Sequence, residues 1–222
     1  MPLAHTIPLL SADDPLPPVT HARPELGGLL AIGGGLSAAR LLGAYRCGVF
    51  PWGTQHGLPL WHYPEPRMVL LPQEFRISRS LGKTLRNSRF VFRHNSDFPG
   101  VIRACAQTPR PGQDGTWISE EMIAAYCELH RLGWAHSAET WLDDELVGGL
   151  YGLWIGQVFF GESMFSWHNN ASKFALAHWV AHLRAEHCGL IDCQMHTAHL
   201  ASLGAREISG TQFQHLLQTL IG

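Results

Sequence analysis

The chain has 222 residues, of which 45% are hydrophobic, and a formal net charge of −2. This composition is typical of one large domain, or of a domain with a small companion, and it argues against disorder. Near-neutral charge means that any contact with nucleic acid must come from a local basic patch. No apolar run approaches the roughly 18 residues of a membrane span and no leader pattern occurs, so we expect a cytoplasmic protein. Five cysteines without framework spacing predict free thiols.

The N-terminal part differs in composition from the rest. Residues 1–36 are rich in proline and glycine, which favours irregular structure with one short strand. A helix is predicted next, with Ser37 as its N-cap and Gly48 just past its end. The segment that follows is FPWGTQHGLPLWHYPEPR, which holds four prolines and two tryptophans. We expect it to be a loop that presents aromatic side chains.

Beyond residue 64, predicted strands alternate with predicted helices. The strands are RMVLL, FVFRH, AHSAETWL, ELVGGLYGLWI, QVFFGES and GLIDCQ, and the third and fourth are expected to form a hairpin through Asp143 and Asp144. Helix starts are predicted from capping residues, namely Ser78 or Ser80, Asp97, Ser119, Asn169 or Asn170, and Ser209. This order predicts an α+β fold with a central mixed sheet over residues 65–222, preceded by a small α/β domain over residues 1–64.

Two acidic residues lie in apolar, strand-like runs. They are Glu162 in VFFGESMFS and Asp192 in LIDCQ. Burying a carboxylate is costly unless a partner or a substrate compensates its charge. Both acids are expected near strand ends, where the sites of such sheets usually gather. They predict a site, although either carboxylate can also be a core group bonded to backbone amides.

A basic segment lies between Glu74 and Asp97 and contains no acid. It holds 6 of the 16 lysines and arginines, which are Arg76, Arg79, Lys83, Arg86, Arg89 and Arg93. Arg79, Lys83 and Arg86 recur at helical spacing and share one face. Taken alone, the pattern fits a solvated helix surface. It also fits a patch that binds phosphates, because clustered cations gain affinity by counterion release.

A series of motifs resembles the leucyl/phenylalanyl-tRNA–protein transferase family. In chain order they are GLLAIGGGLS, AYRCGVFPW, LWHYPEPR, GTWI, AHSAETW, ELVGGLYG, FFGESMFS, NASKFAL, LIDCQ and HLASLGA. The resemblance implies transfer of Leu, Phe or Met from aminoacyl-tRNA to the N-terminal amine of proteins that begin with Arg or Lys, which marks them for degradation through the N-degron pathway. It also implies an N-acetyltransferase-like fold for the larger domain. His62, Trp179 and Leu183 depart from residues common in the family.

The chemistry of the residues agrees with this resemblance. The tRNA ester is already activated, so transfer needs no metal or cofactor, only positioning of ester and amine and help with proton transfer. The resemblance assigns this step to Asp192 and Gln194, which we expect to face the same way on one strand. Glu162 is expected at the rim of the pocket. It either pairs with the ammonium of the transferred amino acid or orients the pocket through hydrogen bonds.

Apolar side chains near the acids suit an aminoacyl pocket. Flexible methionine and flat aromatics accommodate Leu, Phe and Met, and each of them alone also fits plain core. The predicted pocket residues are Leu150, Phe159, Phe160, Met164, Phe165, Phe174, Trp179 and Leu183. Trp52 and Trp117 suit stacking on the terminal adenine of the tRNA, or packing between domains. In the family context, the basic segment is expected to hold tRNA phosphates.

Three alternative functions make different demands on the sequence. Cysteines and histidines of residues 188–199 have the spacing C-x4-C-x2-H-x2-H, which matches no common zinc pattern, so we predict no metal. An acetyl-CoA-dependent N-acetyltransferase needs a glycine-rich pyrophosphate loop, whereas NNASKF offers capping residues. A non-catalytic RNA-binding module would function without Asp192 and Gln194. We expect the protein to be a monomer.

Overall fold

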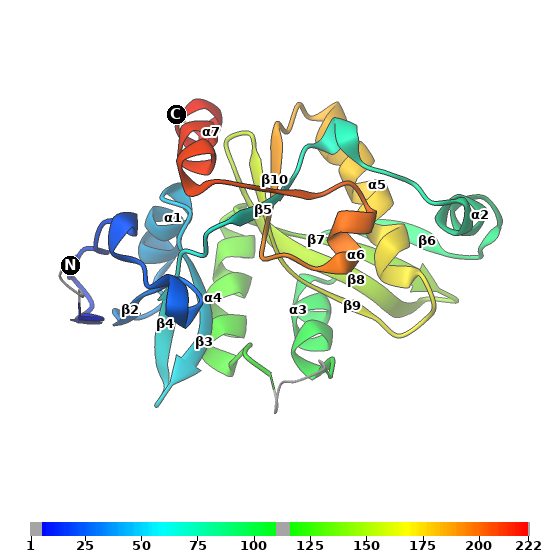
Figure 1. The fold of residues 1–222 in the computed structure, drawn as a ribbon. Coiled ribbons are helices and arrows are strands. Elements are labelled where there is room, and N and C mark those ends of the chain that lie inside the picture. Colours follow the sequence, from blue (N-terminus) through cyan, green and yellow to red (C-terminus); the bar gives the residue numbers. More distant parts are fainter. Residues whose placement is uncertain (1–5, 110–115, 222) are drawn as a thin grey trace.

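The computed structural model describes residues 6–109 and 116–221, and it contains two sheets of different size (Figure 1). The first sheet has four strands in the order β1-β2-β4-β3. Its strands are β1 (Leu9–Leu10), β2 (Leu29–Gly33), β3 (Phe50–Gln55) and β4 (Leu58–His62). Helix α1 (Ala38–Arg46) joins β2 to β3, and Ser37 caps it by accepting a hydrogen bond from the backbone N–H of Arg40. Two 3-10 helices, η1 (Val19–His21) and η2 (Pro24–Leu26), precede β2.

Strands β3 and β4 correct the prediction of an aromatic loop. They form a hairpin because His56 and Gly57 both adopt positive φ, 51° and 77°, as a two-residue turn of this kind requires. Pro51 is tolerated because β3 is an edge strand, where one face of the backbone needs no donor. Trp61 is not presented to solvent. It is fully buried and donates its indole N–H to the carbonyl oxygen of Gly33.

The second sheet has seven strands in the order β11-β5-β10-β9-β8-β7-β6. They are β5 (Arg67–Leu70), β6 (Val91–His94), β7 (Ala135–Leu142), β8 (Glu145–Ile155), β9 (Val158–Ser166), β10 (Leu190–Gln194) and β11 (Arg206–Ile208). Neighbours β9 and β10 run parallel, and the other pairs are antiparallel. The predicted mixed sheet is confirmed, as is the hairpin at Asp143 and Asp144, while β11 was not predicted.

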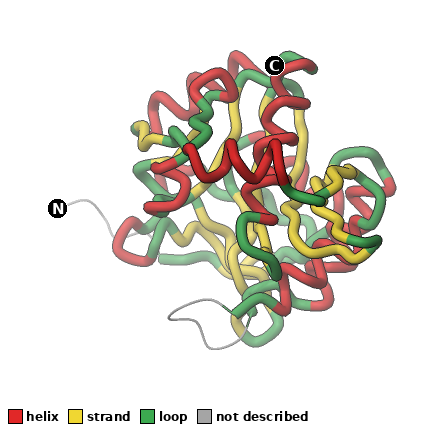
Figure 2. Tube along the Cα trace, turned by 90° about the vertical axis from the view of Figure 1, so that its right-hand side faces the viewer, coloured by secondary structure: helices red, strands yellow, loops and turns green. Residues whose placement is uncertain are grey.

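Helices pack on both faces of the second sheet, and Figure 2 shows helices in red around strands in yellow. They are η3 (Pro72–Glu74), α2 (Arg79–Asn87), α3 (Phe98–Gln107), α4 (Glu120–Arg131), α5 (Ala171–Ala185), α6 (Ala198–Ser202) and α7 (Gly210–Ile221). The predicted caps at Ser78, Asp97 and Ser119 each accept a backbone hydrogen bond. Within the described ranges, no helix is long and apolar enough to cross a membrane.

Apolar side chains form two clusters, one on each face of the second sheet. The larger cluster joins α1 and the first sheet to α3, α4 and α7, so the two sheets share one core. The smaller cluster lies between the opposite face and α5. All five cysteines are free thiols, as predicted. The expected boundary near residue 64 falls between β4 and β5, the last strand of one sheet and the first of the next, and stays a prediction.

Candidate active site

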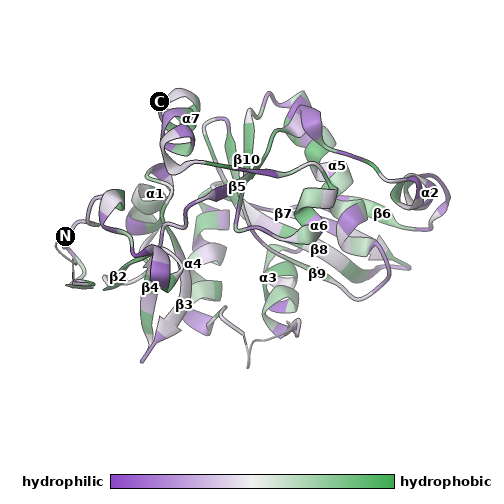
Figure 3. Cartoon of the chain, in the orientation of Figure 1, coloured by the Kyte–Doolittle hydropathy of each residue, from purple (hydrophilic) through white to green (hydrophobic). Residues whose placement is uncertain are grey.

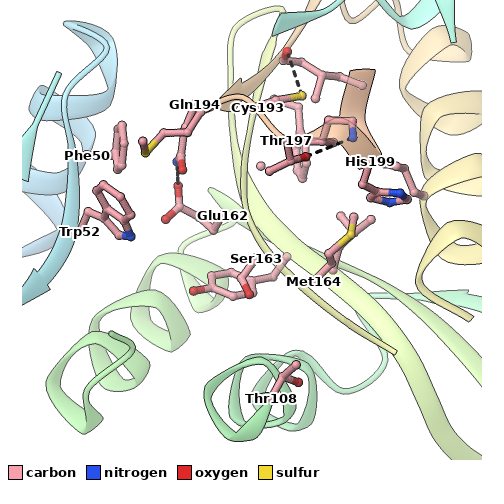
Figure 4. Close-up of a pocket in the computed structure, with 18 of the residues that line it drawn as sticks. Phe50, Trp52, Thr108, Glu162, Ser163, Met164, Cys193, Gln194, Thr197 and His199 are labelled. Atoms are coloured by element: carbon pink, nitrogen blue, oxygen red, sulfur yellow. Dashed lines mark hydrogen bonds between the residues drawn. The ribbon is translucent and has the colours of Figure 1, made fainter. Parts of the chain in front are cut away.

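A cavity of about 450 Å³ opens where β9 and β10 separate. The parallel pairing of these two strands ends at Phe160 and Asp192. Beyond this point, residues of both strands line the cavity. One part of its wall is apolar and includes Leu150, Phe159, Met164, Leu176, Ile191 and Leu200. Figure 4 shows Phe50 and Trp52 on the side of the first sheet, with Met164 and His199 on the far side. Residues of both sheets therefore form the walls of the cavity.

Irregular strand pairing orients the polar side chains of the cavity. In β9, Tyr151 pairs with Ser163 and Gly152 with Gly161, which leaves Glu162 as the extra residue of a β-bulge. In β10, Cys193 occupies a similar register shift, and Gln194 adopts a left-handed conformation with φ of 62°. Bulges often lie next to active sites because they re-aim a side chain.

Glu162 is the centre of a buried hydrogen-bond network. The side-chain amide of Gln194 donates to its Oε1 at 2.7 Å, and the Tyr126 hydroxyl donates to its Oε2 at 3.0 Å. The hydroxyls of Tyr45 and Tyr126 are hydrogen-bonded to each other in turn. Figure 4 shows Gln194 and Glu162 pointing toward one another.

Burial raises the pKa of Glu162 to about 7, because a charged carboxylate loses its hydration there. Hydrogen bonds from Tyr45, Tyr126 and Gln194 lower the pKa, while the negative charge of Asp192 raises it further. Burial also raises the pKa of Tyr126 well above its ordinary value. Near neutral pH, Glu162 is thus the group in this network that can exchange a proton.

Asp192 lies behind the cavity rather than in its wall. Its side chain is fully buried and forms a bidentate ion pair with Arg67. The Nε of Arg67 donates to Oδ1 at 2.8 Å, and Nη2 donates to Oδ2 at 2.6 Å. The backbone N–H of Gln194 donates to the same Oδ1 at 2.9 Å. Contrary to the expectation that they face the same way, Asp192 turns to Arg67 while Gln194 turns to Glu162.

Three aromatic rings surround the Arg67 guanidinium. Its carbon lies 4.5 Å from the ring centre of Phe213, 5.0 Å from that of Phe50 and 5.8 Å from that of Tyr63. These rings come from α7, β3 and the segment after β4. Arg67 is therefore fixed at the junction of both sheets, and it orients Asp192.

The structure brings only some of the predicted pocket residues to the cavity. Leu150, Phe159 and Met164 line it, together with the predicted adenine-stacking residues Trp52 and Trp117. The others do not line it: Phe160, Phe165, Trp179 and Leu183 lie elsewhere in the two cores, and Phe174 is buried against Phe90 and His178. The bulge at Glu162 explains part of the difference, since it places Phe165 on the sheet face opposite Phe159, whereas regular alternation would put both on one face.

The basic segment divides into two parts. Arg89 and Arg93 form ion pairs with Asp143 and Asp144 of the β7–β8 turn. The four predicted tRNA-binding residues are exposed, and among the described residues none of them forms an ion pair: Arg76, Arg79, Lys83 and Arg86. Three of these line a surface groove of about 670 Å³ along α2, a helix that is largely hydrophilic in Figure 3.

Several site residues were missed in the sequence. Tyr45, Arg67 and Tyr126 contact the candidate site, yet none of them stands out in a helix or a proline-rich segment. Leu176 and Ile191 line the cavity but are indistinguishable from core by residue type. A signal for Arg67 did exist, because an arginine opening a strand of wholly apolar residues needs a buried anion.

Comparison with known proteins identifies the family. The family model described as leucyl/phenylalanyl-tRNA protein transferase matches residues 69–218, and the model of its N-terminal domain matches residues 34–65. A leucyl/phenylalanyl-tRNA–protein transferase of Dechloromonas aromatica is 60% identical, covering 96% of this chain and 92% of that protein. One from Chromobacterium violaceum is 57% identical, covering 93% and 88%. Among solved structures, L-PGS from Bacillus licheniformis has 12% identity and a TM-score of 0.39, covering 87% and 66%. The chain belongs to the leucyl/phenylalanyl-tRNA protein transferase family.

Proposed function

We propose that this protein moves Leu, Phe or Met from aminoacyl-tRNA to the N-terminal amine of proteins that begin with Arg or Lys, and so directs them to the N-degron degradation pathway. Membership of the family supports the reaction. The observation that carries it in the structure is a cavity with an apolar wall at one end and the hydrogen-bonded pair Glu162 and Gln194 beside it. We further propose a cytoplasmic monomer, with an N-acetyltransferase-like domain over residues 65–222 after a small domain over residues 1–64.

Each part of the cavity suits one part of the substrate. The wall formed by Leu150, Phe159 and Met164 fits an unbranched or γ-branched apolar side chain. Trp52 and Trp117 offer flat surfaces on which the terminal adenine can stack, worth roughly 1–3 kcal/mol. This arrangement holds the ester between the aromatic side chains and the apolar wall.

The catalytic cluster consists of Asp192, Gln194 and Glu162. Because the tRNA ester is already activated, these residues need only hold the reactants and assist proton transfer. Gln194 and Glu162 line the cavity, where they can reach the incoming amine. Asp192 holds the Gln194 backbone in its left-handed conformation.

A transfer assay tests the proposal directly. Labelled Leu-tRNA is mixed with a model peptide that begins with Arg, and the extended peptide is detected. A peptide that begins with Glu serves as the matched control and should stay unmodified. No extension from Leu-, Phe- or Met-tRNA would refute the proposed function.

The unpaired cations of α2 are expected to hold the tRNA by its phosphates. Reversing Arg79 and Lys83 to Glu should weaken tRNA binding and reduce the salt dependence of log K by about one for each lost contact. The measurement is tRNA affinity at several salt concentrations. The same double reversal at Arg89 and Arg93, which are already ion-paired, is the control and should have a smaller effect. Equal losses in both variants would place the tRNA elsewhere.

Leu150 is expected to limit the size of the transferred side chain. Leu150→Phe adds volume to the cavity wall and should lower kcat/KM for Phe-tRNA about tenfold more than for Leu-tRNA. Phe174→Leu, at a buried residue that does not line the cavity, should leave the ratio of the two substrates unchanged. A parallel loss for both substrates in Leu150→Phe would show that this residue is not a pocket wall.

A further inference from the structure

The two buried carboxylates of the site differ in their access to the cavity. Asp192 is fully buried, is absent from the cavity wall, and accepts two hydrogen bonds from Arg67 and one from the Gln194 backbone. Both oxygens of this carboxylate are therefore committed to donors behind the cavity. Asp192 does not reach the amine of a substrate in the cavity.

Glu162 has the opposite properties. It lines the cavity, and its side chain accepts hydrogen bonds from Gln194 on Oε1, from Tyr126 on Oε2 and from Tyr45. A carboxylate has about four acceptor positions, so at least one remains for a substrate. Arg67 is already committed to Asp192. Among the described residues, Glu162 is thus a carboxylate with an open acceptor position and no ion-pair partner.

We propose that Glu162, rather than Asp192, accepts the proton of the incoming N-terminal ammonium, an inference that rests on the proposed transfer reaction. One N–H bond of the ammonium breaks, and its proton goes to a Glu162 oxygen. The freed nitrogen lone pair forms a C–N bond with the ester carbonyl carbon. The C–O bond to the ribose then breaks, and the ribose oxygen takes a second proton from the same nitrogen. Glu162 finally releases its proton to water.

The surroundings of Glu162 set the pH at which it can do this. The titratable groups that face it are Tyr45 on α1, Tyr126 on α4 and Asp192 on β10, with Arg67 on β5 behind Asp192. Burial raises the pKa of Glu162 to about 7, and efficient proton acceptors have a pKa near the working pH. Arg67 and Tyr126 are positioning residues in this scheme. Arg67 fixes the position of the Asp192 carboxylate, and Tyr126 holds the Glu162 carboxylate toward Gln194.

The test is the pH dependence of single-turnover transfer from saturating Leu-tRNA to a peptide that begins with Arg. Rates are compared for the wild type, Glu162→Gln and Glu162→Asp between about pH 6 and about pH 8.5, a range that spans the α-amine pKa of roughly 7.7–8.0. Glu162→Gln should be slower by about 100-fold at the acidic end. This deficit should shrink at least about tenfold at the alkaline end, where most of the amine is already free.

Glu162→Asp keeps a carboxylate and should recover part of the rate, leaving a smaller deficit that is also largest at the acidic end. If Glu162→Gln fails to fold, Glu162→Asp alone still tests the proposal. The Asp side chain is one methylene shorter, so its carboxylate lies farther from the amine. The rate of this variant should therefore fall chiefly below the α-amine pKa. A deficit that is the same at every pH, or no deficit, overturns the proposal. If instead the wild type transfers nothing, the proposed function itself has failed, which is a separate result.

Discussion

Replacing Asp192 by Asn should lower the free energy of unfolding by about 3–5 kcal/mol, the usual cost of removing one partner of a buried ion pair. The variant leaves the Arg67 guanidinium fully buried without an anion. Both oxygens of Asp192 accept hydrogen bonds from Arg67. In the Asn variant, the side-chain NH₂ group replaces one of these oxygens and faces an N–H group of Arg67, from which it cannot accept a hydrogen bond. Because Asp192 orients the Gln194 backbone, turnover should fall as well, while tRNA affinity changes little. The measurement is chemical denaturation alongside single-turnover transfer.

A matched surface pair provides the control. Asp143→Asn breaks the pair with Arg89, in which both side chains are mostly exposed, and should cost less than about 1 kcal/mol. A second control replaces both charges, as Arg67→Met with Asp192→Leu, and should recover most of the lost stability without recovering transfer. If Asp192→Asn costs no more than Asp143→Asn, the Arg67 pair is not isolated from water in solution.

Much of the fold follows from local sequence signals that tertiary contacts did not oppose. The turn at Asp143 and Asp144 was predicted from two polar residues between alternating apolar runs, and both adopt positive φ in the structure. Capping residues such as Asp97 marked helix starts correctly. The β3–β4 hairpin was missed because its prolines favour loops, and the edge position of β3 makes Pro51 acceptable.

The site was predictable in its charges but not in its geometry. Glu162 and Asp192 stood out because each interrupts an apolar run, and they lie on neighbouring strands. The two carboxylates differ in position because Arg67 binds Asp192 and not Glu162, and Arg67 is 125 residues from Asp192 in the chain. A bulge shifts side chains to the other face, so Phe159 lines the cavity while Phe165 does not. Neither the ion-pair partner nor the bulge leaves a periodic pattern in the sequence.

Replacing Glu162 by Gln should make the protein relatively more stable as pH rises. Burial raises the pKa of Glu162 in the folded protein to about 7, above the ordinary value of 4.5. The folded state therefore binds this proton more tightly than the unfolded state. The stability that protonated Glu162 contributes is fully present below about pH 4.5 and is lost as pH rises through about 7. At about 1.4 kcal/mol for each pKa unit, the loss amounts to about 3 kcal/mol.

Gln at position 162 keeps the size and the acceptor oxygen of protonated Glu but cannot ionise. The difference in unfolding free energy between Glu162→Gln and the wild type should thus grow by about 3 kcal/mol from pH 4 to about pH 8.5, measured by denaturant titration at each pH. Tyr126→Phe is the informative companion. It removes a hydrogen bond that lowers the pKa of Glu162, so the pH at which the wild-type curve bends should move upward in this variant. A difference that stays constant across this range would mean that Glu162 does not change charge between the folded and unfolded states, and the carboxylate would then need a compensating cation that the described residues do not place beside it.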